Sequence, residues 1–176
     1  THKTTSLQNS LLSARLHDPF SYLGVHREKG RTLVRVFRPH DVNVWIRTTI
    51  GYEPMSRIHA NGIFEWRGEF PPEMPYRLRI EAKGDTQSVY ETYDAYAFPL
   101  QISDHDVYLF NEGKLRQAYR MLGAQRVRNS GVDGVRFSVW APNAGRVSVV
   151  GDFNRWDGRI HPMAVHHASG VWELFI

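Results

Sequence analysis

The fold is decided by a stretch that reads Arg136-Phe137-Ser138-Val139-Trp140-Ala141-Pro142-Asn143-Ala144-Gly145-Arg146-Val147-Ser148-Val149-Val150. Apolar residues alternate with polar ones on both sides of a Pro-Asn-Ala-Gly turn. A period of two is typical of a strand with one buried face, and the turn residues separate two such strands. We therefore predict a strand-turn-strand hairpin from Val135 to Val150.

The same hairpin is predicted earlier in the chain, from Leu33 to Arg47. An offset of 103 superimposes the two segments, and two flanking segments repeat as well. A repeat of this kind predicts two copies of one β-unit. In the hairpins, the residues Val34, Val36, Phe37, Pro39, Val44 and Ile46 match, in that order, Phe137, Val139, Trp140, Pro142, Val147 and Val149. Before the hairpins, Phe20 to Gly24 match Tyr119 to Gly123, and after them Gly62 to Glu65 match Gly170 to Glu173.

The second copy has a longer loop after its hairpin. Pro54-Met55 matches Pro162-Met163 at an offset of 108 instead of 103, so the loop from Gly151 to Arg159 accounts for five additional residues. Binding residues concentrate on loops that a rigid scaffold holds in place. This loop is therefore where we expect a binding site.

Three residues of the loop are candidate carbohydrate-binding residues, namely Trp156, Asn154 and Asp157. The indole of Trp156 offers a face on which the C–H surface of a sugar can stack, and Asn154 and Asp157 supply groups that hydrogen-bond hydroxyls. A second interpretation stays open, in which Trp156 packs against another domain of a longer chain. Trp140 and Trp172 stand in strand patterns, which favours the sandwich core or an interface.

The second copy also ends early relative to the first. After Glu65 the first copy continues with an apolar/polar alternation from Tyr76 to Ala82 and with residues 94–98, whereas the second ends at Ile176. A sandwich without its last strands exposes a sheet edge and part of its core. We therefore expect a longer natural chain, a second module weaker than the first, and an edge-paired dimer as one outcome for isolated copies.

Short helices are predicted outside the two β-units. Four leucines between Leu7 and Leu16 fit one face of a leading helix. Ser103 or Asp104 can cap a helix that Gly113 ends, and a further helix is expected over residues 115–122. The predicted organisation is a leading helix at 1–17, a first β-module at 18–102, a helical connection at 103–123 and a second β-module at 124–176.

The composition excludes several classes of protein. Hydrophobic residues make up 41% and charged residues 23%, as in globular domains, and no apolar run approaches the ~20 residues that span a bilayer. The net charge of +4 comes from scattered Lys and Arg, so we expect no nucleic-acid partner. There is no cysteine, the nine histidines lack zinc-ligand spacing, and no nucleotide motif occurs. We expect no metal and no cofactor, and a cytoplasmic location.

The chain resembles the bacterial 1,4-α-glucan (glycogen) branching enzymes. Residues 18–26 resemble the DPFxxLGxH opening motif of that family, and residues 136–144 and 147–158 are similar to its glycogen-binding carbohydrate-binding module. The resemblance runs from about Leu16 to Ile176. One departure is Ala124-Gln125, where the family has Ala-His.

The resemblance implies a mainly β fold of two tandem immunoglobulin-like β-sandwich modules with short connecting helices, the second module incomplete. It implies the non-catalytic N-terminal region of a glycosyltransferase of glycogen biosynthesis, which positions α-glucan (glycogen or maltooligosaccharides) and docks on a catalytic barrel of the same chain. The whole enzyme would transfer α-1,4-glucan segments to 6-hydroxyls. Such a barrel takes ~250 residues, so no catalytic residue is carried over. A stand-alone α-glucan-binding or scaffolding protein is the alternative, and the reading frame beyond Ile176 would discriminate.

Overall fold

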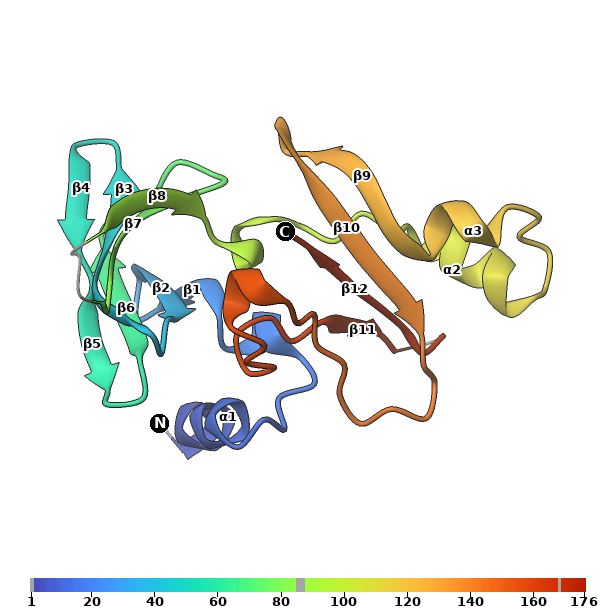
Figure 1. The fold of residues 1–176 in the computed structure, drawn as a ribbon, viewed down its shortest axis with the longest axis horizontal. Coiled ribbons are helices and arrows are strands. Elements are labelled where there is room, and N and C mark those ends of the chain that lie inside the picture. Colours follow the sequence, from blue (N-terminus) through green and yellow to red (C-terminus); the bar gives the residue numbers. More distant parts are fainter. Residues whose placement is uncertain (1, 85–87, 168) are drawn as a thin grey trace. The chain divides into compact units, whose positions relative to one another are not determined.

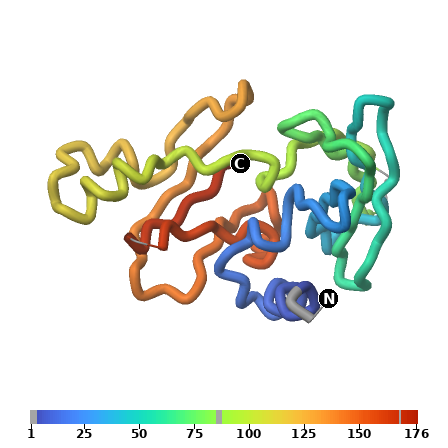
Figure 2. The backbone as a smooth tube through the Cα atoms, turned by 180° about the vertical axis from the view of Figure 1, so that it is seen from behind, coloured from blue at the N-terminus to red at the C-terminus, as the bar shows by residue number. Residues whose placement is uncertain are grey.

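The computed structural model describes residues 2–84, 88–167 and 169–176. The chain divides into two compact units (Figures 1 and 2). We call Tyr22–Ala97 the first module, and Thr1–Ser21 with Phe98–Ile176 the second unit. No helix among the described residues has the length and apolar character needed to cross a membrane.

The first module consists of two four-stranded antiparallel sheets with the strand orders β1-β2-β6-β5 and β4-β3-β7-β8 (Figure 1). Val34 and Val36 of one sheet and Leu78 and Ile80 of the other are completely buried, so the core lies between the sheets. The strands are β1 (Gly24–Glu28), β2 (Arg31–Phe37), β3 (Asp41–Thr48), β4 (Gly51–Pro54), β5 (Ser56–His59), β6 (Ile63–Gly68), β7 (Arg77–Ala82) and β8 (Val89–Tyr93).

The predicted hairpin at Leu33 to Arg47 is wrong in its pairing, although both of its strands are confirmed. β2 pairs with β1 and β6, whereas β3 pairs with β4 and β7, so the turn carries the chain from one sheet to the other. Pro39 lies in that turn and has no N–H for a sheet hydrogen bond. Alternation predicts a strand and its buried face, but it does not show which strand lies beside it.

The second unit repeats the first sheet strand for strand. Its sheet has the order β11-β12-β10-β9, built from β9 (Gly123–Asn129), β10 (Val132–Trp140), β11 (Ala164–His166) and β12 (Val171–Phe175). The register repeats as well, which confirms the internal repeat. Phe37↔Ile63, Val36↔Phe64 and Arg35↔Glu65 of β2 and β6 become Trp140↔Val171, Val139↔Trp172 and Ser138↔Glu173 of β10 and β12.

Among the described residues of the second unit, the other sheet of the repeat is represented by a single bridge, Ser148↔Pro162. It corresponds to Trp45↔Pro54 of the first module. The predicted hairpin at Val135 to Val150 is therefore wrong in the same way as the first, because its second arm turns away from β10. Within the described residues the second unit thus has one complete sheet, and Val139 on its inner face is 39% exposed where Val36 is fully buried.

The helices are shorter than predicted. The leading helix α1 covers His2–Leu12, not residues 1–17, because Ala14 adopts a left-handed conformation with φ of 57°. Ser103 caps α2 (Asp104–Asn111), with its hydroxyl accepting from the Asp106 N–H at 3.1 Å, as predicted. The remaining helical turns are α3 (Ala118–Met121), η1 (Pro19–Ser21), η2 (Ala95–Ala97) and η3 (Asp152–Asn154).

The connection containing α2 and α3 packs on the outer face of the sheet of the second unit. Ile102, Val107, Met121 and Val171 form one buried cluster there. Glu173, which is 1% exposed, accepts hydrogen bonds from the backbone N–H groups of Gln101 and Ile102. A buried carboxylate is costly without partners, so this contact fixes the connection to the sheet.

Candidate functional site

The five-residue-longer loop folds into η3 followed by two residues in the left-handed region. Arg155 has φ of 54° and Trp156 has φ of 57°. Non-glycine residues enter this region rarely and at a cost, so the surrounding contacts must hold them there. Ile160 is buried at the end of the loop and returns the chain toward the sheet.

Asn154 supplies the principal contacts that hold the loop. Its side chain is 3% exposed. Its Oδ1 accepts from the Gly151 N–H at 2.9 Å, and its Nδ2 donates to the Val149 carbonyl at 2.8 Å and lies 2.9 Å from Nδ1 of His161. The amide therefore joins both arms of the loop, and its hydrogen-bonding atoms point inward.

Asp157 is also engaged within the loop. One carboxylate oxygen accepts from the backbone N–H and Nε of Arg159 at 3.0 and 2.9 Å, and the other accepts from a terminal guanidinium nitrogen at 2.7 Å. This two-pronged ion pair raises the pKa of the Arg159 guanidinium. It fixes the backbone directly after Trp156.

Trp156 differs from its two neighbours because it faces solvent. Its side chain is 66% exposed, and its Nε1 donates to Asp152 at 2.8 Å, which fixes the orientation of the indole. Phe153 of the same loop is 58% exposed. Phe153 was not among the residues predicted for the site, and its only sequence signal is an aromatic residue between Asp152 and Asn154.

The chemistry of this arrangement suits binding and gives no support to catalysis. Asp152 and Asp157 are occupied by Trp156 and Arg159, so they do not form a free carboxylate pair. In the parts of the chain that the structure describes, no group of three His, Cys, Asp or Glu side chains could hold a metal ion. Exposed aromatic rings on a rigid loop can stack on the apolar face of a sugar.

The two tryptophans predicted to lie in the sandwich core or at an interface, Trp140 and Trp172, differ in how far they are exposed. Trp172 is 2% exposed and lies in the core, as predicted. Trp140 is 54% exposed, and its ring meets Phe110 of α2 edge-on with 5.8 Å between centroids. Trp140 is therefore not a core residue within the described part of the chain.

Comparison with known proteins gives two family matches. Residues 4–96 match the family described as "alpha-1,4-glucan branching enzyme GlgB, N-terminal domain", and residues 121–176 match "Carbohydrate-binding module 48 (Isoamylase N-terminal domain)". The loop described above lies inside the second match.

The chain is also similar to curated proteins named 1,4-alpha-glucan branching enzyme GlgB. It is 63% identical to the protein of Nitrosospira multiformis over 96% of this chain, 61% identical to that of Nitrosomonas europaea over 97%, and 59% identical to that of Nitrosomonas eutropha over 97%. It spans 23% of the length of each of these relatives. Because the first family match covers more than half of its residues, the chain belongs to the family of alpha-1,4-glucan branching enzyme GlgB N-terminal domains.

Proposed function

We propose that the chain is the non-catalytic N-terminal region of a 1,4-α-glucan branching enzyme of glycogen biosynthesis. In this proposal, the loop of the second unit holds α-glucan while a catalytic barrel of the same parent chain transfers α-1,4 segments to 6-hydroxyls. The observation that carries the proposal is the exposed indole of Trp156 on a loop in which Asp152, Asn154 and Asp157 already have hydrogen-bond partners. The carbohydrate-binding module match over the same residues supports it.

The three candidate residues have different parts in this proposal. Trp156 contacts the sugar by stacking, and Phe153 extends the aromatic surface. Asn154 and Asp157 serve the site by holding Arg155 and Trp156 in the left-handed conformation. Stacking of this kind contributes about 0.5–1.5 kcal/mol, so the affinity for one sugar is modest and repeated contacts along a polymer matter.

The experiment is affinity electrophoresis in gels that contain glycogen, using the 176-residue chain and the parent enzyme. Trp156→Ala should migrate faster than the unmodified protein, because it is retained less. Phe70→Ala removes a comparably exposed aromatic ring, 72% exposed in the first module, and should leave retention unchanged. Equal mobility of Trp156→Ala and the unmodified protein, with matching circular dichroism, would show that Trp156 is a packing residue.

Docking on the catalytic barrel belongs to the same proposal. Val139 on the inner face of the second-unit sheet, whose counterpart in the first module is buried, supports a covering domain. The curated relatives, about four times as long as this chain, favour this role over a stand-alone glucan-binding protein. A cytoplasmic location is part of the same proposal, since the lack of cysteine gives no support for an oxidising compartment.

We also propose that isolated copies of the chain pair through a sheet edge. β9 and β11 are the outer strands of the second-unit sheet, and outer strands carry backbone groups that can pair with another chain. Sedimentation equilibrium of the 176-residue chain should then give a concentration-dependent dimer. A monomer at all concentrations would contradict the pairing and leave the glucan proposal unaffected.

A further inference from the structure

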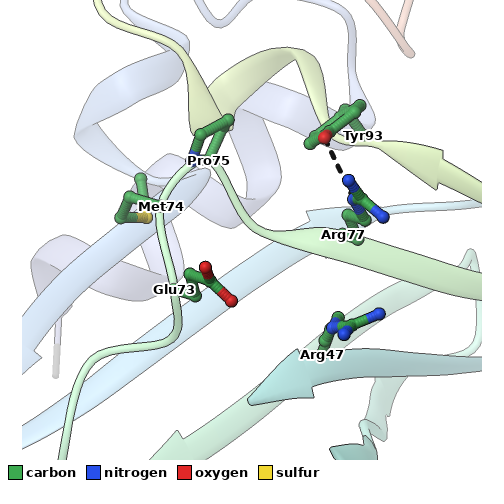
Figure 3. Close-up of a pocket in the computed structure, with 6 residues that line it drawn as sticks. All are labelled: Arg47, Glu73, Met74, Pro75, Arg77 and Tyr93. Carbon is green, nitrogen blue, oxygen red and sulfur yellow. Dashed lines mark hydrogen bonds between the residues drawn. The ribbon is translucent and has the colours of Figure 1, made fainter. Parts of the chain in front are cut away.

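The first module contains a pocket of about 200 Å³ that the sequence repeat does not explain (Figure 3). It is lined by Arg47, Glu73, Met74, Pro75, Arg77 and Tyr93. Ile46 and Leu78 are fully buried, so their strand neighbours Arg47 and Arg77 project from the outer face of the β4-β3-β7-β8 sheet. The pocket therefore opens on the outside of the sandwich, where β7 begins and β8 ends.

Two guanidinium groups, those of Arg47 and Arg77, reach this pocket. Arg77 donates from Nε to the Tyr93 hydroxyl at 3.0 Å and covers the Tyr93 ring with 5.1 Å to the centroid, which holds both side chains in place. Arg47 lies 5.9 Å from the ring centroid of Tyr52. Among the described residues, Glu91 of β8 lies close enough to interact electrostatically with both arginines, although its ion pair is with Arg79.

Glu73 brings an acceptor to the same opening. Figure 3 shows its carboxylate on the segment before β7, facing the side on which the two arginines lie. Its side chain is exposed, and it makes no ion pair with any residue that the structure describes. Met74, which is 51% exposed, adds an apolar wall beside it. The pocket thus combines charged donors, one charged acceptor and an apolar surface.

This combination selects the chemistry of the ligand. Glu73 and Glu91 together balance the charge of the two arginines, so the pocket has no excess charge that would select an anion or a cation. A neutral sugar presents hydroxyls that donate to a carboxylate and accept from guanidinium groups, together with C–H faces for Met74 and Pro75. The volume lies below the roughly 300–1,000 Å³ of pockets for larger ligands, so a single sugar ring suits it.

The face beside the pocket offers room for a longer chain. Tyr52 pairs across from Arg47 and is covered by Arg79, with 4.0 Å from the guanidinium carbon to the ring centroid. Arg79 in turn pairs with Glu91 at 3.1 Å. Donors, acceptors and aromatic rings therefore continue along β4, β7 and β8.

We propose that this pocket is a second α-glucan site, which binds one glucosyl unit of a chain through Arg47, Glu73 and Arg77. This inference rests on the proposed glucan function. Because the pocket has no exposed tryptophan comparable to Trp156, it binds more weakly than the loop of the second unit. Two sites of unequal strength on one chain increase retention on a polymer more than on short sugars.

The test is a titration of the 15N-labelled 176-residue chain with maltotriose, followed by amide chemical shifts. Saturable shifts are expected at residues 73–77 and at Tyr93, separately from those at residues 151–158. Arg47→Ala and Glu73→Gln should each weaken the response of the pocket by about tenfold while leaving the loop response unchanged. Arg31→Ala removes an exposed arginine of the other sheet and should change neither response.

The outcomes separate this inference from the proposed function. Shifts at residues 151–158 without shifts at the pocket would overturn the second site and leave the first standing. Pocket shifts that persist in Trp156→Ala would support an independent site. A parallel titration with inorganic phosphate tests the ligand class, because saturation of the pocket by phosphate but not by maltotriose would overturn a neutral sugar as its ligand.

Discussion

Asn154 is the residue on which the shape of the binding loop depends most. Asn154→Ala leaves the Gly151 N–H and the Val149 carbonyl without their partner, and it should lower the free energy of unfolding by about 1–3 kcal/mol. Glycogen retention should fall with it, because Trp156 loses its support. Chemical denaturation measures the first effect. Asn143→Ala, an exposed asparagine of the preceding turn, is the control and should change neither quantity.

Asp94 gives the first module a pH dependence. Burial raises its pKa above the ordinary value of 3.8, although Arg38 and the hydrogen bond from Tyr76 oppose the shift. The folded state therefore holds the proton more tightly than the unfolded state. The contribution of Asp94 to the free energy of unfolding is greatest below pH 3.8, falls as the pH rises through the folded pKa, and is constant above it.

Asp94→Asn should remove this part of the pH dependence, because an amide does not titrate in this range. The stability of the unmodified protein relative to the variant should fall as the pH rises from the ordinary aspartate pKa, and then level off. Hydrogen exchange of the β7 amides, followed at a series of pH values, measures this difference in stability. Asp133→Asn, whose carboxylate is 85% exposed, is the control; an unchanged difference for Asp94→Asn across the range would contradict the assignment.

At the scale of elements, each module has a glycine that meets a proline in its sheet-crossing turn. A Cβ on Gly62 would lie 2.4 Å from Cα of Pro39, and a Cβ on Gly170 would lie 2.4 Å from Cα of Pro142. Both glycines have positive φ. The Gly62 carbonyl accepts from the Arg38 N–H with 2.7 Å between nitrogen and oxygen, and the Gly170 carbonyl accepts from the Ala141 N–H with 2.9 Å. The contact that redirects the chain is therefore the same in both modules.

Gly62→Ala and Gly170→Ala should destabilise their own modules by similar amounts. Left-handed strain costs roughly 1–2 kcal/mol and the steric overlap about 1–3 kcal/mol more. Gly30→Ala and Gly131→Ala are matched controls, since both glycines have positive φ but open space around them, and they should show the strain alone. Thermal unfolding measures the stability of all four variants. Equal losses of stability in the two variants and the two controls would contradict the steric argument.

Sequence alone predicted the strands and the position of the loop for a physical reason. Burial of one face dictates alternation at Val34, Val36 and their counterparts, and a five-residue insertion must project from the scaffold. Pairing partners were not predictable, because they depend on contacts such as that of Gly62 with Pro39. Nor was the inward position of Asn154, since an amide suits a sugar hydroxyl and a backbone carbonyl equally well.

Across the whole molecule, the two sheets that follow the sheet-crossing turns are unequally developed. Residues of β3 pair with both β4 and β7, whereas residues 147–149 meet 161–163 through one bridge. Backbone groups with fewer paired neighbours open more easily. Amides of residues 147–149 should therefore exchange with solvent faster than those of residues 44–46 in the isolated chain. Equal protection of the two segments, measured by NMR, would contradict this.

The shared register has a consequence for how tandem copies avoid misfolding. β2 could in principle insert beside β12, and β10 beside β6, because the backbone ladders match. The buried polar position of β2 and β10 disfavours this exchange. Arg35 pairs with Glu65 at 2.9 Å, whereas Ser138 leaves room for Met121, whose carbonyl accepts from the serine hydroxyl. A swapped β10 would leave Glu65 without Arg35, and a swapped β2 would drive Arg35 into the space of Met121. The difference between Arg35 and Ser138 therefore favours pairing of each strand within its own copy.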